Sequence, residues 1–178
     1  RSNVGLHALW AWTMDGADRA GVTNEDLYFG NQDNGTFGTT TAGTNPPTWI
    51  NPNCCDTFDM LADPAWVLGT ICCFNTGRGN RLELAAPGYT GNAEINTYPT
   101  GNIPGFTFAR RMARFGTNSV ALITSTGLNI TTNITANPIV WTSLGQPAGA
   151  NACGVWSSVT GGTPTFFLQS DQCTGAGN

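Results

Sequence analysis

The fold is decided by five segments near the C-terminus: SVALITS (119–125), NITTNIT (129–135), PIVWTSL (138–144), ACGVWSSV (152–159) and TFFLQSD (165–171). Each segment has the length and the β-branched and aromatic content that are typical of strands. The TGGT sequence (160–163) between the last two segments is typical of a hairpin turn. The last third of the chain is therefore predicted to be a run of antiparallel strands.

Composition extends this prediction to the whole chain. Gly (23), Asn (18) and Thr (26) make up 67 of the 178 residues, which favours turns and strands over helices. We predict an all-β fold, an antiparallel β-sandwich of jelly-roll or immunoglobulin-like type with long loops and one or two short helices; a barrel is the main alternative. Because no internal repeat and no linker is found, residues 1–178 are expected to form a single domain.

The first half of the chain gives weaker signals. GLHALWAWTM (5–14) alternates so that Leu6, Trp10 and Trp12 share one face, which predicts a strand. This strand belongs either to the protein's own core or, by strand exchange, to the sheet of a neighbouring subunit. The chain is then polar and rich in Gly and Pro over about 15–47, where we expect a long exposed loop region with one short strand at LYFG (27–30).

The middle of the chain mixes helix and strand signals. DTFDMLAD (56–63) begins with an N-cap residue and has apolar residues at helical spacing, which predicts one or two helical turns. AWVLGTICCF (65–74) and RLELA (81–85) predict two strands, the first of them buried. FARRMARFG (108–116) fits a short helix or a strand, and we favour the helix.

Charge excludes several classes of function. The chain has 7 basic and 11 acidic residues, a net charge of −4 and a pI near 4.6, which argue against a nucleic-acid partner. All the basic residues are Arg, so lysine chemistry is excluded. No apolar run approaches the roughly 20 residues of a membrane span, and no membrane insertion is expected.

Candidate catalytic residues are few. His7 is the single histidine and lies in a predicted strand, which excludes a His-dependent triad or a multi-His metal site, and no metal or cofactor is expected. Glu83 and Glu94 flank a predicted turn and are the residual possibility for a glycoside hydrolase. Because Glu83 alternates with Leu82 and Leu84, we interpret it as a solvent-facing residue. The chain is therefore predicted not to be an enzyme.

The cysteines are even in number, which fits disulfides formed in an oxidising compartment. They are Cys54, Cys55, Cys72, Cys73, Cys153 and Cys173. Adjacent Cys-Cys doublets do not match the Cys-x-x-Cys spacing of structural zinc sites. Disulfides are therefore favoured, with free buried thiols as the next alternative, and the pairing of the disulfides stays open.

Two charged segments stand out. Five acidic residues lie within 19 positions and are interpreted as a solvated loop, because no calcium-loop spacing matches them: Asp15, Asp18, Glu25, Asp26 and Asp33. The only basic cluster is Arg110, Arg111 and Arg114. We hypothesise that the acidic loop and this cluster meet across an interface between subunits. The candidate interface residues are Leu6, Trp10, Trp12, Arg110, Arg111 and Arg114.

Two further features concern glycans. Asn129 and Asn133 each begin an Asn-Ile-Thr sequence that fits the pattern for N-glycosylation. The six tryptophans, Trp10 and Trp12 among them, include candidates for a surface on which a sugar ring stacks.

These observations favour a structural protein of an exposed particle or fibre, either a viral capsid or spike domain or the subunit of an extracellular filament. Such a protein self-associates through β-rich surfaces, so its partners are copies of itself. The alternative is a secreted carbohydrate-binding module or lectin that uses exposed Trp and Tyr, with glycans as partners. Both hypotheses predict an extracellular or virion-surface location.

Overall fold

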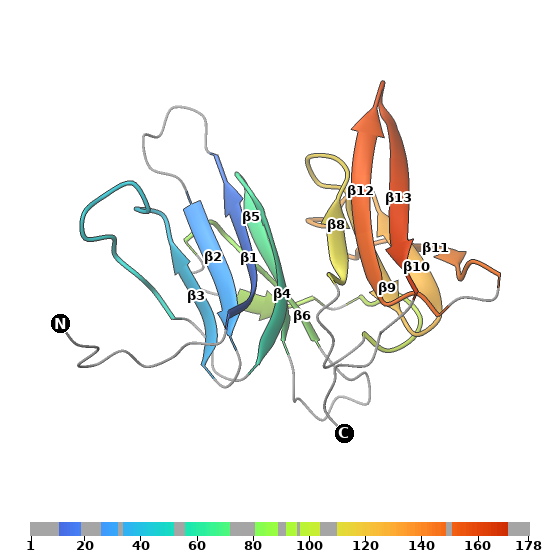
Figure 1. Cartoon of the computed structure of the whole chain (residues 1–178), viewed down its shortest axis with the longest axis horizontal. Helices are drawn as coiled ribbons and strands as arrows, with labels where there is room; N and C mark the ends of the chain where they lie inside the picture. The colour runs from blue at the N-terminus through green and yellow to red at the C-terminus, as the bar shows by residue number, and fades with distance from the viewer. Residues whose placement is uncertain are drawn as a thin grey trace.

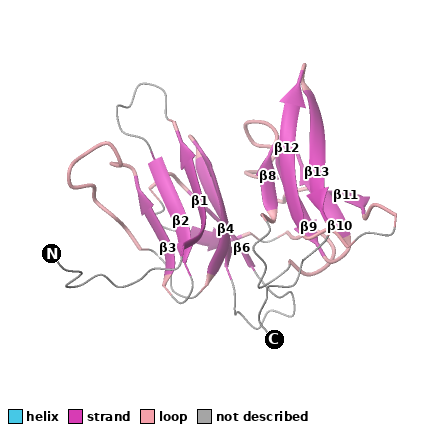
Figure 2. Ribbon diagram, in the orientation of Figure 1, coloured by secondary structure: helices cyan, strands magenta, loops and turns pink. Residues whose placement is uncertain are grey.

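The computed structural model describes residues 11–18, 26–31, 34–51, 56–71, 81–88, 92–95, 97–103, 110–148 and 151–170. These residues form strands, turns and loops, and none of them is helical (Figure 2). The described chain therefore contains no long apolar helix of the kind that spans a membrane.

The described strands form three sheets and one hairpin, all antiparallel. The N-terminal sheet consists of β1 (Ala11–Ala17), β2 (Asp26–Asn31) and β3 (Gly35–Thr39). The central sheet consists of β4 (Thr57–Asp63), β5 (Trp66–Ile71), β6 (Arg81–Ala85) and β7 (Asn92–Glu94). The C-terminal sheet consists of β8 (Met112–Arg114), β9 (Val120–Thr124), β10 (Gly127–Thr131) and β11 (Thr142–Gly145). The hairpin consists of β12 (Gly154–Thr160) and β13 (Thr163–Gln169).

Within every sheet, neighbouring strands are consecutive in the chain. The predicted all-β, antiparallel fold is confirmed. A jelly-roll or immunoglobulin-like sandwich needs a Greek-key connection, in which a strand returns beside one that is distant in sequence. Among the described strands all pairings join sequence neighbours, so these two topologies are not confirmed.

The sheets are stacked as layers, with the N-terminal and central sheets on the left of Figure 1 and the C-terminal sheet and the hairpin on the right. Three clusters of buried residues lie between them. The first joins the N-terminal and central sheets and contains Ala17, Tyr28, Met60, Ala62, Val67 and Ala85. The second joins the central and C-terminal sheets and includes Leu61, Trp66, Leu68, Met112, Val120 and Leu122. The third joins the C-terminal sheet and the hairpin and contains Ala113, Ala121, Ile123, Leu128, Ala152 and Val155.

Strand β4 replaces the helix predicted over 56–63. Its side chains alternate between two cores, with Leu61 in the second and Met60 and Ala62 in the first. All seven residues of β4 are buried. An apolar stripe on one side of a helix would fill one core, whereas a strand places successive side chains on opposite faces and fills both. The helix prediction was therefore wrong because packing on two faces overrides local spacing.

The helix favoured over 108–116 is also corrected. Met112–Arg114 form β8 at one edge of the C-terminal sheet, with Met112 opposite Leu122. Met112 and Ala113 are buried on opposite faces, Met112 in the second core and Ala113 in the third. The period-two alternative for this segment is thus the one that the structure adopts.

The region expected to be a long exposed loop, about 15–47, contains the end of β1 and all of β2 and β3. Phe29 and Phe37 face each other across β2 and β3, with stacked rings 5.4 Å apart. Tyr28 is fully buried, and its hydroxyl donates to Asp26 Oδ2 and accepts from the Gly88 N–H. Strand β3 has one large apolar residue, so its sequence carries little periodic signal.

Several other predicted strands are confirmed, but of the segments predicted over 129–135 and 138–144 only 129–131 and 142–144 lie in strands. Strand β5 lies within the predicted 65–74 segment and is buried throughout, and β6 spans the predicted 81–85. The β12–β13 hairpin turns at Gly161 and Gly162, which both have positive φ values (57° and 81°). Two consecutive residues with positive φ are what a tight hairpin turn requires. Of the strand predicted over 5–14, the described part begins with β1 at Ala11.

Candidate functional site

The three clustered arginines close the outer edge of β4. Strand β5 pairs with one side of β4, and the carbonyl groups of alternate residues point away from the other side. These carbonyls accept hydrogen bonds from guanidinium groups, with Arg111 Nη1 donating to Phe58, Arg110 Nη2 to Met60 and Arg114 Nη1 to Ala62. We call this side of β4 the closed edge, because side chains take the place of a neighbouring strand.

The N–H groups on the same side of β4 are bound by carboxylates. The Ala62 N–H donates to Asp15 Oδ2 of β1 at 2.8 Å, and the Met60 N–H donates to Asp59 Oδ1 at 3.0 Å. Strand β2 also packs closely against the start of β4, because a Cβ added to Gly30 would meet the Thr57 carbonyl oxygen. The side chains of the closed edge therefore join β4 to β1 and β8.

Asp59 is the centre of the closed edge. Its side chain is almost fully buried, and its Oδ2 accepts from the backbone N–H groups of Arg111 and Met112 at 2.7 and 2.9 Å. Its Oδ1 accepts from Met60 and from the Thr13 hydroxyl. All four partners are donors, so both oxygens act as acceptors, as they do in an ionised carboxylate.

Burial and nearby charges have opposite effects on the pKa values in this cluster. Burial raises the pKa of Asp59 above its ordinary value, while Arg110, the Met112 N–H and Arg111 act in the opposite direction. Burial lowers the pKa of Arg111 to about 10, and Asp59 opposes this change. Arg111 therefore remains charged at neutral pH although its side chain is fully buried, with its guanidinium carbon 4.9 Å from the centre of the Phe58 ring.

The remaining two arginines form ion pairs within the same chain. Arg110 lies 3.5 Å from Asp15 and 3.8 Å from Asp59, and Arg114 lies 3.2 Å from Asp63. Asp15 belongs to the acidic segment that was predicted to meet the arginines across a subunit interface. The two segments meet here within one chain, and Arg111 is inaccessible. The predicted interface between copies stays a prediction, with Arg110 and Arg114 as its accessible members.

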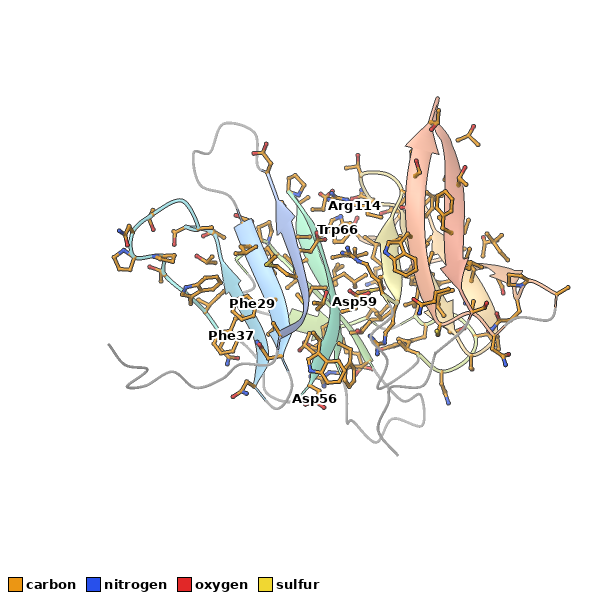
Figure 3. The ribbon with its side chains drawn as sticks, viewed as in Figure 1. Phe29, Phe37, Asp56, Asp59, Trp66 and Arg114 are labelled. Carbon is orange, nitrogen blue, oxygen red and sulfur yellow. The ribbon has the colours of Figure 1, made fainter. Side chains whose placement is uncertain are left out.

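A pocket of about 220 Å³ lies beside the closed edge, where β4, β8 and β12 approach one another. We call it the edge pocket. It is lined by Asp15, Leu61, Arg110, Ala113, Arg114, Val155, Trp156 and Ser157. Trp156 is 43% exposed, and the Ser157 hydroxyl donates to the Arg114 carbonyl. Figure 3 shows Arg114 and Asp59 between the central sheet and the layers that follow it. The pocket thus combines guanidinium, carboxylate, hydroxyl and indole groups.

The hairpin beside this pocket has two different faces. Val155, Phe166 and Leu168 pack against the third core. Trp156 and Phe167 are opposite each other in the register of β12 and β13, and both are exposed, Phe167 by 57%. No residue of 154–169 is charged, and the tip of the hairpin projects beyond the C-terminal sheet (Figure 1). In the described part of the chain no strand pairs with the outer side of β13, which we call the open edge.

Other predicted interface and cysteine residues have mixed outcomes. Trp12 is half-buried on β1, where its ring packs edge-on against Phe58 at 5.3 Å, and Leu6 and Trp10 lie outside the described residues.

Cys153 is buried and disulfide-bonded. Cys54, Cys55, Cys72, Cys73 and Cys173 lie outside the described residues, as does His7, so the predicted disulfide framework stays a prediction.

The predicted solvent exposure of Glu83 was wrong. Glu83 is 1% exposed and forms an ion pair with Arg81, because layers pack on both faces of the central sheet. Glu94 is opposite Glu83 in the register of β6 and β7, is exposed, and accepts a hydrogen bond from the Tyr98 hydroxyl at 2.8 Å. The two carboxylates are thus cross-strand neighbours, one buried in an ion pair and one at the surface.

The two candidate glycosylation sites differ. Asn129 is 1% exposed, and its Nδ2 donates to Thr124 Oγ1 and to the Gly127 carbonyl, both at 3.0 Å. A glycan on this buried nitrogen is incompatible with the folded chain. Asn133 is exposed in the turn that follows β10, and its modification stays a prediction.

The acidic segment is not uniformly solvated. Asp15 is paired at the closed edge, Asp26 is buried beside Tyr28, and Asp18 is exposed. Glu25 and Asp33 lie outside the described residues. Within the described ranges, no group of three or more His, Cys, Asp or Glu residues is arranged to hold a metal ion.

Comparisons with known protein families, with curated proteins and with solved structures found no match for this chain. The case for a function therefore depends on the closed edge, the edge pocket and the hairpin. Sequence reasoning identified the arginines and the pattern of the hairpin. It missed Asp59 and Asp63, although three aspartates among the apolar residues of 56–63 were a signal that charges are paired there.

Proposed function

We propose that this protein is a structural subunit that associates with copies of itself through the β12–β13 hairpin. The observation that supports this most directly is the open edge of β13 on a hairpin that has no charge and exposes two aromatic side chains, Trp156 and Phe167. Unpaired backbone groups along a strand edge are a template for another strand. The predicted capsid, spike or filament role would use such an edge.

A second copy is the partner that the hairpin fits best. An antiparallel pair of identical strands is related by a two-fold axis, so one β13 is complementary to another β13 without any further partner. The net charge of −4 opposes the approach of two copies, but the hairpin contributes none of it. Natural edge strands are protected from such pairing by charges or proline, and β13 has only Pro164, near its tip.

Exposed aromatic residues add to this argument. Trp156 and Phe167 lie side by side on the outer face, and aromatic residues are enriched in the buried centres of protein interfaces. The disulfide at Cys153 supports the proposed extracellular or virion-surface location, because disulfides persist in oxidising environments.

The test is the oligomeric state measured by sedimentation velocity over a range of protein concentrations. We expect the wild-type chain to form dimers or larger species and Phe167→Lys to shift the distribution to monomer, because a lysine on the outer face puts like charges together in the interface. Met14→Lys is the matched control, since Met14 is equally apolar and exposed (64%) but lies on β1. A wild-type chain that stays monomeric at its solubility limit, or equal effects of the two variants, would overturn the proposal.

A further inference from the structure

We infer that the edge pocket binds a single neutral pyranose ring, such as the end residue of a glycan. The pocket volume of about 220 Å³ is below the roughly 300–1,000 Å³ of pockets for drug-sized molecules. One sugar ring therefore fits the pocket better than an extended ligand does. The polar groups Arg110, Arg114 and Asp15 are not part of the hairpin, whereas Trp156 is shared with the proposed interface between copies, so the two proposals are tested with separate variants.

The polar groups of the pocket match the hydroxyl groups of a sugar. Each sugar hydroxyl both donates and accepts, and the pocket offers donors on Arg110 and Arg114, an acceptor on Asp15 and a hydroxyl on Ser157. Within the described residues, the hydrogen bonds of the Arg114 side chain are all made by Nη1. Its Nη2 and Nε are therefore the donors that remain for a ligand, in the fixed fork geometry of a guanidinium group.

The charge of the pocket favours a neutral ligand over an anion. Each lining arginine already has a carboxylate beside it, Asp15 for Arg110 and Asp63 for Arg114. The Asp15 carboxylate lines the pocket itself, and it would repel a ligand carboxylate or phosphate. The positive charges of Arg110 and Arg114, which an acidic sugar would require, are thus already paired with carboxylates of the protein.

Trp156 supplies the apolar surface. It lines the pocket and is 43% exposed, and an indole face packs well against the C–H groups of a sugar ring. Its neighbour Phe167 is exposed on the same face of the hairpin but does not line the pocket. The chain therefore provides a matched pair of aromatic residues, one in the proposed site and one outside it.

The experiment is a titration of the protein with the methyl glycosides of glucose, galactose, mannose and N-acetylglucosamine, followed by the indole N–H signals in ¹H–¹⁵N NMR spectra. We expect at least one glycoside to shift the Trp156 signal in a saturable manner. Trp156→Ala should weaken binding roughly five- to tenfold, and Phe167→Ala should leave it unchanged. Arg114→Lys, which keeps the charge but removes the fork, should also weaken binding several-fold.

The outcomes separate this inference from the proposed function. Phe167→Lys tests self-association and should leave glycoside binding unchanged, whereas Arg114→Lys tests the pocket and should leave the sedimentation profile unchanged. Absence of a saturable shift with all four glycosides would overturn the inference. Tighter binding of methyl glucuronide than of methyl glucoside would overturn the assignment of a neutral sugar.

Discussion

Strands β4 and β13 are both edge strands of seven residues. In the described part of the chain, the unpaired edge of β4 is covered by side chains, whereas the outer edge of β13 is not. The outward carbonyl groups of Phe58, Met60 and Ala62 on β4 are each bound by an arginine side chain. No strand among the described residues pairs with the outer edge of β13, and no charge lies on it. The chain has few charged residues, and their placement thus decides which edge another strand is able to pair with.

The two edges are also stabilised by different interactions. The closed edge depends on buried charges, which are costly unless each one has its partner. The hairpin depends on one apolar face, and its outer face contributes little to the folded state. Substitutions at the closed edge should therefore change folding, while substitutions on the outer side of the hairpin should change association alone.

The largest effect is expected for Asp59→Ala. The substitution leaves the buried Arg111 guanidinium without a carboxylate and removes the acceptor of the Arg111 and Met112 N–H groups. We expect a loss of about 3–5 kcal/mol in the free energy of unfolding, measured by urea denaturation. Asp18→Ala is the control, because Asp18 is exposed, and it should stay within about 0.5 kcal/mol of wild type. Similar values for the two variants would show that the closed edge is not held by Asp59.

An intermediate and graded effect is expected when the arginines are replaced by methionine, which keeps much of the side-chain volume. Arg111→Met should cost about 3 kcal/mol of unfolding free energy, because Arg111 is fully buried and Asp59 loses one of its two guanidinium neighbours. Arg114→Met should cost about 1 kcal/mol, because Arg114 is 38% exposed and water replaces part of its interactions. The same denaturation measurement checks both values, and equal losses would contradict the assigned difference in burial.

The smallest effect on stability is expected for Thr165→Lys on β13. Thr165 is exposed on the hairpin, so the free energy of unfolding should stay within about 0.5 kcal/mol of wild type. A lysine at an open edge is a common protection against pairing, so the sedimentation profile should shift towards monomer. A variant that associates as wild type does, with unchanged stability, would show that copies meet elsewhere.

The sequence predicted those strands whose environment is simple. The continuous apolar run of β5 and the Gly161–Gly162 turn of the hairpin are local signals that no distant residue overrides. DTFDMLAD was interpreted as a helix because Phe58, Leu61 and Ala62 fit helical spacing as well as they fit a strand. The strand is favoured over the helix only because layers pack on both sides of β4. A local sequence pattern does not show where such layers lie.

The charge pairs of the candidate site were also not predictable from local sequence patterns. The arginine cluster was recognised from sequence, but its partners Asp59 and Asp63 lie about fifty residues earlier, within the segment that was interpreted as a helix. Glu83 appeared solvent-facing because it alternates with leucines, but buried clusters lie on both faces of the central sheet. Pairing of distant charges depends on the order in which the sheets are stacked, which local spacing does not encode.

The closed edge has a consequence for the nascent chain. Strands β1 to β7 precede the arginines in the sequence, so they leave the ribosome before Arg110, Arg111 and Arg114 are made. During that interval β4 has Asp59 without its guanidinium partners and a row of unbound carbonyl groups. The emerging polypeptide is thus most vulnerable to pairing with other nascent chains just before residues 110–114 appear, and pauses in translation ahead of that point would lengthen the exposure.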